Sequence, residues 1–291
     1  MGQAALVALL ALAACNQVYG LEATAVLDAP YRVDGPPDAP QRCPPLGTPL
    51  RATGVLNQVV RQNCFTYTAS AGSQIAVATC EVLDEMGNKY VASEGRLDDS
   101  MAPIDLAAPI GTTIDQAHIS PEGDEIYVRA TTAMVGAVVV YRRQADGKWT
   151  FGEQLPIAQT ASFNIGGVTR RPHRHLLLLA GSAFYEYVSD DAGNWPETKQ
   201  YTFAQLDVTL AQTPTISSDG LRILFSGYSS IVGAMFQTRY AERAGIDDNF
   251  MGSQPVMNMP SAPDPFLIDD CSRIYFSSAS LQSVFAADLA Y

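Results

Sequence analysis

The stretch Ile216-Ser-Ser-Asp-Gly-Leu-Arg-Ile-Leu-Phe225 has the pattern of a β-hairpin. A strand end is followed by a tight turn at Asp219-Gly220 and then by a strongly apolar strand. The same pattern returns 51 residues later as Leu267-Ile-Asp-Asp-Cys-Ser-Arg-Ile-Tyr-Phe276, with Asp270 in the place of Asp219. A repeated hairpin indicates that the chain is built from similar β-modules.

Tracing the hairpin along the chain gives five copies. Their turns lie at Gly72, Gly123, His173, Gly220 and Cys271, with spacings between 47 and 51 residues. The copy at His173 is degenerate, because Arg and His replace the usual turn residues. Five recurrences at nearly constant spacing predict radial or stacked β-units of about 50 residues.

Each repeat has room for two more strands between successive hairpins. No segment shows a helical stripe of apolar residues. Four antiparallel strands per unit predict an all-β propeller of about five four-stranded blades over residues 46–291, with a degenerate sixth blade as the alternative. The additional strands are expected at Gly136–Arg143, 149–155, Ala183–Val188, from Trp195 onward, 233–240 and from Phe250 onward.

The last unit lacks an outer strand of its own. Residues 46–51 have no hairpin and resemble the outer strand of the second unit, so we expect this N-terminal segment to complete the last blade. Such closure removes an open sheet edge that would otherwise invite aggregation.

The hairpin phrases at 119–128 and 216–225 resemble the repeat of TolB-type, WD-repeat-like β-propellers, with an apolar residue, Ser-Pro-Asp-Gly and an apolar-aromatic strand. The resemblance extends over about residues 46–291. TolB-type propellers usually have six blades, whereas five repeats are counted in this chain. The resemblance implies protein–protein contacts in the periplasm.

The cysteines fit a closed ring. Cys64 and Cys80 lie eight residues on either side of Gly72 and should face each other across the first hairpin. Cys43 precedes the closing strand, and Cys271 lies in the turn of the blade that it closes, so we expect these two to form a disulfide. Four free thiols are the alternative.

The sequence Leu12-Ala-Ala-Cys15 resembles a bacterial lipobox and follows an apolar run. This resemblance implies that residues 1–14 are a signal peptide and that Cys15 is lipidated. Residues 15–45 are rich in proline and are predicted to be an extended tether. With Asn16 after the cysteine, we expect a lipid-anchored protein at the periplasmic face of the outer membrane.

Charge and motifs exclude several function classes. The net charge of −12 argues against a nucleic-acid partner. The sequence has no nucleophile elbow, phosphate-binding loop or Cys-x-x-Cys, and we expect no cofactor and no metal. Of the three histidines, His173 and His175 lie in an arginine-rich turn that should be solvated. Gln116 and His118, at the end of an inner strand, are the candidates for the channel mouth.

These features favour a monomeric, lipid-anchored β-propeller that acts as a non-enzymatic scaffold for unidentified envelope proteins. One alternative is a carbohydrate-directed or metal-dependent propeller enzyme of the lyase or hydrolase type. Another is a structural envelope component that binds peptidoglycan or polysaccharide. Asp219 occupies a position where the repeat requires a turn former, so we expect a structural role for it.

Overall fold

The computed structural model describes residues 43–290, apart from 61, 72–74, 85–86, 107–112, 132–135, 158–162, 232–234 and 279–282. For 83–84 and 87–89 it describes the backbone only. The predicted turn residue Gly72, the lipobox at Cys15 and the residues predicted as signal peptide lie outside the described part. In the described residues, no helix is long and apolar enough to cross a membrane.

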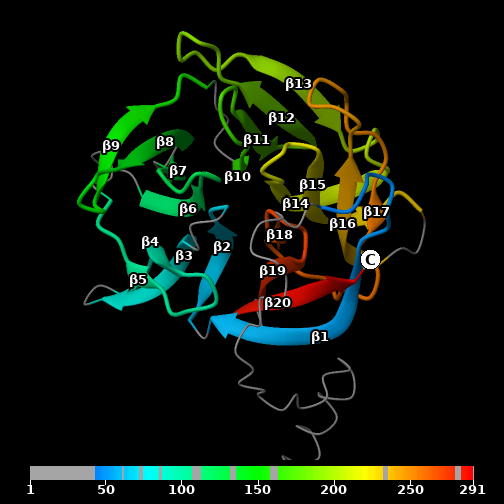
Figure 1. The fold of residues 1–291 in the computed structure, drawn as a ribbon, viewed down its shortest axis with the longest axis horizontal. Coiled ribbons are helices and arrows are strands. Elements are labelled where there is room, and N and C mark those ends of the chain that lie inside the picture. The colour runs from blue at the N-terminus through cyan, green and yellow to red at the C-terminus, as the bar shows by residue number, and fades with distance from the viewer. Residues whose placement is uncertain are drawn as a thin grey trace, which may run out of the picture. The chain divides into compact units, whose positions relative to one another are not determined.

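Five four-stranded antiparallel sheets form the blades of a β-propeller, which confirms the predicted fold class and blade count (Figure 1). The first blade contains β2 (Cys64–Ala69), β3 (Ile75–Asp84), β4 (Gly87–Arg96) and β5 (Ala102–Pro103). The second contains β6 (Thr113–Ile119), β7 (Glu125–Thr131), β8 (Gly136–Arg143) and β9 (Trp149–Gln154). The third contains β10 (Phe163–Val168), β11 (His175–Ala180), β12 (Ala183–Val188) and β13 (Glu197–Thr202).

The last two blades follow the same order from the axis outward. The fourth contains β14 (Val208–Ile216), β15 (Arg222–Ser229), β16 (Phe236–Glu242) and the short β17 (Gln254–Pro255). The fifth contains β18 (Phe266–Leu267), β19 (Arg273–Ser278), β20 (Ser283–Ala290) and β1 (Arg51–Val60). The outer strand predicted from Phe250 onward therefore starts four residues later and is only two residues long.

The repeated turn is held by its own side chains. The Asp219 carboxylate accepts hydrogen bonds from the backbone N–H of Leu221 (3.0 Å) and the Ser217 hydroxyl (2.6 Å). Gly220 adopts a positive φ of 72°, which a residue without Cβ adopts at little cost. In the fifth blade Cys271 takes the equivalent conformation with φ 59°, and Asp270 accepts a hydrogen bond from the backbone N–H of Ser272.

The ring is closed by an N-terminal strand in the last blade, as predicted, but the residues differ. The closing strand is β1, Arg51–Val60, which pairs antiparallel with β20. Residues 46–50 lie before it and bind the fourth blade instead: the Leu50 N–H donates to the Tyr240 hydroxyl (3.2 Å) and the Gly47 N–H to Glu242 (2.7 Å). The N-terminal segment therefore fastens two blades, because its first residues are anchored before the strand begins.

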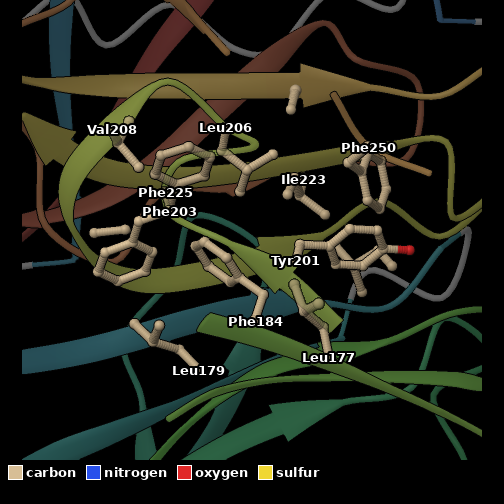
Figure 2. Close-up of a cluster of buried hydrophobic side chains, with 13 residues drawn as sticks. Leu177, Leu179, Phe184, Tyr201, Phe203, Leu206, Val208, Ile223, Phe225 and Phe250 are labelled. Atoms are coloured by element: carbon tan, nitrogen blue, oxygen red, sulfur yellow. The ribbon is translucent and has the colours of Figure 1, made fainter. Parts of the chain in front are cut away.

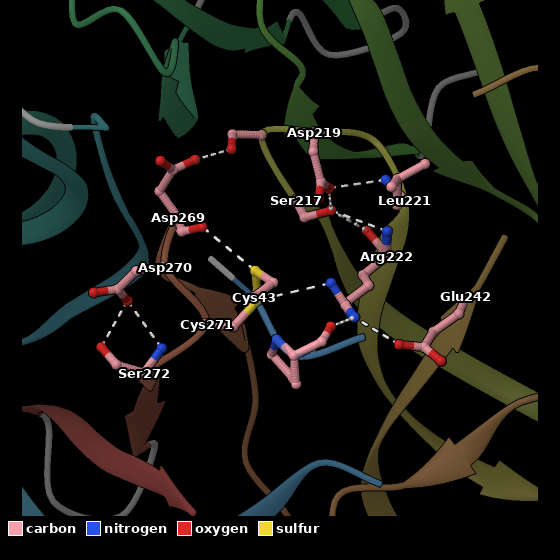
Figure 3. The surroundings of a disulfide bond; sticks show 12 residues. Cys43, Ser217, Asp219, Leu221, Arg222, Glu242, Asp269, Asp270, Cys271 and Ser272 are labelled. Atoms are coloured by element: carbon pink, nitrogen blue, oxygen red, sulfur yellow. Dashed lines mark hydrogen bonds and ion pairs between the residues drawn. A yellow bond between two sulfur atoms is a disulfide. The ribbon is translucent and has the colours of Figure 1, made fainter. Parts of the chain in front are cut away.

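Two disulfides are present, with the predicted pairing. Cys64 and Cys80 join opposite residues of β2 and β3, and Cys43 joins Cys271 across 228 residues of sequence. Figure 3 shows the second bridge beside Arg222, a fully buried guanidinium. Arg222 donates to the Pro44 carbonyl (2.6 Å) and to Glu242 (2.8 Å), so it ties the N-terminal segment to the fourth blade.

Apolar clusters fill the spaces between neighbouring blades. Figure 2 shows the cluster between the third and fourth blades, where aromatic rings from both sheets meet. Phe184 of β12 and Phe225 of β15 have ring centroids 5.3 Å apart, and Tyr201 of β13 lies 5.3 Å from Phe250. Such contacts stabilise the ring mainly through apolar burial.

Candidate functional site on the propeller axis

The five inner strands surround the propeller axis (Figure 1). A cavity of about 10 Å³ at the axis is lined by residues from all five blades, among them Thr66, Gln116, Thr213 and Asp264. A second cavity of about 20 Å³ lies nearer the hairpin turns, and His118 lines both. Each cavity is close to the size of one water molecule. A saccharide or other organic ligand could therefore bind at an end of the channel but not inside it.

Hydrogen bonds at a spacing of about one repeat connect the inner strands around the axis. The Thr68 hydroxyl accepts from the Ile119 N–H (3.1 Å), joining the first two blades. The Asp264 N–H donates to the Thr213 hydroxyl (3.0 Å), joining the last two. Many axial polar side chains are thus occupied in holding the blades together.

Asp264 is the buried carboxylate of the axis. The Ser277 hydroxyl donates to its Oδ2 at 2.6 Å, and the backbone N–H of Thr66 in the first blade also donates to it. Burial raises the pKa of Asp264, while these hydrogen bonds only partly oppose the shift. Its backbone is left-handed, with φ 50°. A carboxyl with a raised pKa and a strained backbone is a candidate proton donor.

Asp115, on the inner strand of the second blade, is a second carboxylate near the axis, and it lies in a different environment. It sits at a bulge in β6 and accepts two hydrogen bonds from the Arg129 guanidinium, at 2.6 and 2.9 Å. The Asp115 side chain is 24% exposed, so it is more accessible than Asp264. The bidentate guanidinium fixes the orientation of the Asp115 carboxylate and lies opposite its charge.

An amide chain connects Asp115 to the cavity that Asp264 lines. Arg129 also donates to the Asn164 side-chain oxygen (2.9 Å), and that oxygen accepts from the Gln116 amide (3.0 Å). The Gln116 carbonyl accepts from the Ile165 N–H (2.8 Å). Gln116, which the sequence placed at the channel mouth, therefore lines the axial cavity and joins the second and third blades.

His118 lies between the two axial cavities. Neither ring nitrogen has a hydrogen-bond partner among the described residues, and burial lowers its pKa to about 3. The imidazole is therefore neutral at physiological pH. Gly167 of the neighbouring blade lies beside the ring, and a Cβ at that position would be in ordinary van der Waals contact with Nδ1, at 3.6 Å. The histidine predicted at the channel mouth is thus enclosed within the axis.

The end of the channel at the hairpin turns is closed by polar contacts across the ring. Arg170 of the third blade forms an ion pair with Asp269 of the fifth, and the Ser218 hydroxyl of the fourth blade donates to the same carboxylate. The Arg170 N–H also donates to the Ser218 carbonyl at 2.9 Å. Because these contacts occupy the end at the hairpin turns, the opposite end, where the inner strands begin, is the candidate end for a ligand.

The prediction of a solvated basic turn is wrong for His175, because this residue begins β11 and is buried. Its Nδ1 lies 2.5 Å from Glu186, a carboxylate with no exposed surface. Arg243 and Tyr201 donate to the same carboxylate. His173, in contrast, is exposed as expected.

Arg174 is also buried, against the prediction, since it pairs with Glu122 at 3.0 Å and lies over the ring of Tyr127. In the described part of the chain, no group of three or more His, Cys, Asp and Glu side chains could hold a metal ion.

Asp264 was missed at the sequence level, although a signal for it exists. It follows Thr213 by 51 residues, as Pro265 follows Pro214, and Thr213 is the fourth-blade equivalent of Gln116. Extending the repeat alignment from Gln116 would therefore have placed Asp264 on the axis. Asp115 could not be found in this way, because no pattern in the sequence indicates its partner Arg129.

No protein-family model matches this sequence, and no curated protein is similar enough in sequence to count as a relative. Among solved structures, a glycosyl hydrolase from Bacteroides ovatus is similar in fold. Its TM-score is 0.52 at 11% identity, with 78% of this chain and 83% of that chain covered. A GH62 hydrolase in complex with xylotriose has a TM-score of 0.50 at 11% identity, covering 83% of this chain and 97% of that chain.

These structures correct the interpretation based on TolB. Propellers described as glycoside hydrolases replace the TolB-type proteins as the structural counterparts of this chain. The prediction of a non-enzymatic scaffold rested on the TolB-type propellers. It is corrected, together with the expectation that the protein is not an enzyme, because the solved structures that share this fold are described as hydrolases. An identity of 11% shows the fold alone, so an activity for this chain has to be argued from its own residues.

Proposed function

We propose that this propeller acts on a carbohydrate at the end of its channel where the inner strands begin. The observation that carries the proposal is the pair of axial carboxylates in opposite environments, Asp264 buried and Asp115 held by Arg129. Hydrolysis of a glycosidic bond commonly uses two such carboxyl groups, one protonated and one ionised. The shared fold with glycoside hydrolase propellers supports the same reaction class.

In this proposal each carboxyl group has a separate role. Asp264, with its raised pKa, supplies the proton for the leaving oxygen. Asp115, oriented by the Arg129 guanidinium, accepts a proton from the water molecule that attacks the anomeric carbon as the bond to the leaving oxygen breaks. Polar groups nearby, such as Asn164 and Gln116, can accept or donate hydrogen bonds to sugar hydroxyls.

The test is a screen of the purified protein against a panel of plant and microbial polysaccharides, followed by the variants Asp264→Asn and Asp115→Asn. We expect each variant to lower kcat by about 100-fold to 10,000-fold, which is the usual contribution of a positioned acid or base. Glu153→Gln is the matched control, since Glu153 forms a surface ion pair with Arg142 outside the site.

Two results would contradict the proposal. One is the absence of hydrolysis on every polysaccharide of the panel by correctly folded protein. The other is hydrolysis that persists unchanged in both Asp264→Asn and Asp115→Asn.

We also propose that the protein acts from a membrane surface, through a lipid on Cys15. The support is the sequence Leu12-Ala-Ala-Cys15 alone, which resembles a lipobox. A Cys15→Ala variant expressed in a bacterial host should move from the membrane fraction to the soluble fraction. Unchanged partition with membranes would contradict the anchor.

A further inference from the structure

A groove separate from the axis lies between the outer parts of the first and second blades. Its volume is about 660 Å³, within the range of sites that hold drug-sized ligands. The described residues that line it come from both blades: Ile75, Glu94, Gly95, Arg96, Ala102, Ile104 and Arg143. None of these residues lines the axial cavities, so the groove is separate from the axial site.

One wall of the groove is a fixed cluster of three side chains. Glu94 accepts from Arg143 at 2.9 Å and from the indole N–H of Trp149 at 2.6 Å. The Arg143 guanidinium also lies over the Trp149 ring, 5.5 Å from its centroid. Glu94 is therefore neutralised, and the wall is positioned before any ligand arrives.

Arg96 leaves the groove with a net positive charge. It is exposed at the end of β4, and no described residue forms a hydrogen bond or ion pair with its guanidinium. Arg143 uses one N–H group for Glu94, so further donors of its fork stay available. Although the chain has a net charge of −12, the two guanidinium groups and the one carboxylate of this groove leave it with a local positive charge.

Apolar groups line other parts of the same groove. Ile75 and Ile104 are half-buried and pack against the core cluster between the first and second blades, so they offer a firm apolar surface. A ligand that satisfies both features has an apolar face and a carboxylate. A uronic acid residue has this combination, because the C–H face of its ring is apolar and its carboxylate fits a guanidinium fork.

We infer that this groove binds a uronate-bearing saccharide, with Arg96 as the main contact to the carboxylate. The choice of a saccharide rests on the proposed function, whereas the choice of an acidic unit rests on the groove itself. The groove would hold an acidic part of a polysaccharide while the axial site acts elsewhere on the chain.

The test measures binding of trigalacturonate and of its fully methyl-esterified form to the intact protein by calorimetry. We expect the acid to bind at least about tenfold more tightly than the ester, and Arg96→Gln to remove most of that difference. Arg142→Gln is the matched control, because Arg142 precedes Arg143 on the same strand but is paired with Glu153 outside the groove. It should leave binding unchanged.

Equal binding of acid and ester, or unchanged binding in Arg96→Gln, would overturn the inference. Full displacement of trigalacturonate by an equal concentration of acetate would also overturn it, since the groove would then recognise only a carboxylate. The Asp264→Asn variant separates the two proposals: it should retain trigalacturonate binding in the groove even if the axial site proves inactive.

Discussion

Glu186 and Asp264 are two buried carboxylates of the same ring, and their surroundings shift their pKa values in opposite directions. Burial alone would raise the pKa of Glu186, but hydrogen bonds from His175, Arg243 and Tyr201 outweigh it and bring the value down to about 2. Burial raises the pKa of Asp264, where every partner is neutral. The direction of the pKa shift therefore distinguishes a buried carboxylate that holds blades together from one that is a candidate for function.

At Glu186 each oxygen has partners, and the cluster joins β12 of the third blade to Arg243 after β16 of the fourth. Such a network is structural, because all of its charge is compensated inside the protein. At the axis, Asp264 has no cationic partner among the described residues, and His118 has no partner at all among them. Incomplete compensation of this kind indicates a functional site.

The largest expected effect on stability is that of Glu186→Gln. The substitution leaves the fully buried Arg243 without an opposite charge, and we expect the free energy of unfolding to fall by about 3–5 kcal/mol. Urea denaturation at neutral pH measures it. Glu153→Gln, which breaks an exposed pair, should cost less than about 1 kcal/mol. Equal losses in the two variants would show that the Glu186 cluster is no more structural than a surface pair.

The second prediction concerns acid. Because Glu186 has a lowered pKa in the folded state, its contribution is complete above its unfolded value near 4.5 and is lost as the pH falls towards about 2. A shift of this size corresponds to roughly 3 kcal/mol. The free energy of unfolding, measured from pH 6 to pH 2, should therefore fall less steeply in Glu186→Gln than in the wild type. Parallel curves would contradict the lowered pKa.

Asp264 should behave in the opposite way. Its raised pKa means that it favours the folded state below the unfolded value near 3.8, and that this contribution disappears as the pH rises through the folded pKa. In the wild type, the free energy of unfolding should therefore decrease as the pH rises through the folded pKa of Asp264, and Asp264→Asn should remove this decrease. At neutral pH the substitution should change the free energy of unfolding by only about 1 kcal/mol, since the amide oxygen can still accept from Ser277. A loss as large as that of Glu186→Gln would place Asp264 among the structural charges.

The smallest expected effect is that of His118→Phe. The imidazole is 2% exposed and neither nitrogen is bonded within the described structure, so an apolar ring of similar shape removes no hydrogen bond. We expect the free energy of unfolding to change by less than about 1 kcal/mol, in either direction. Thermal and urea unfolding would measure it, with His175→Phe as the contrast. A loss of several kcal/mol would mean that His118 has a structural partner.

Much of the fold could be predicted from the sequence, because each blade repeats a local signal. Strands such as Gly136–Arg143 and Ala183–Val188 were predicted with the bounds that the structure shows. The turn at Asp219-Gly220 depends on contacts within a few residues, so its chemistry is visible in the sequence. The disulfide partners followed from the same repeat, since ring closure brings Cys43 to the turn that contains Cys271.

The exact closing strand could not be predicted in the same way. Residues 46–50 are held by Tyr240, Glu242 and, through Pro44, by Arg222 of the fourth blade, and nothing in the local pattern of 46–51 indicates those partners. The strand therefore begins at Arg51, only after these contacts end.

The sequence by itself determined the β-repeat and its turn chemistry, and it favoured five blades over six and two disulfides over free thiols, because local periodicity and spacing encode these features. Only the tertiary structure decided which polar residues matter at the axis. Asp115 and Arg129 lie on different strands, and Glu186 and Arg243 belong to different blades, so only folding brings the members of each pair together. Desolvation and partner geometry are properties of the packed ring, so no stretch of sequence states them.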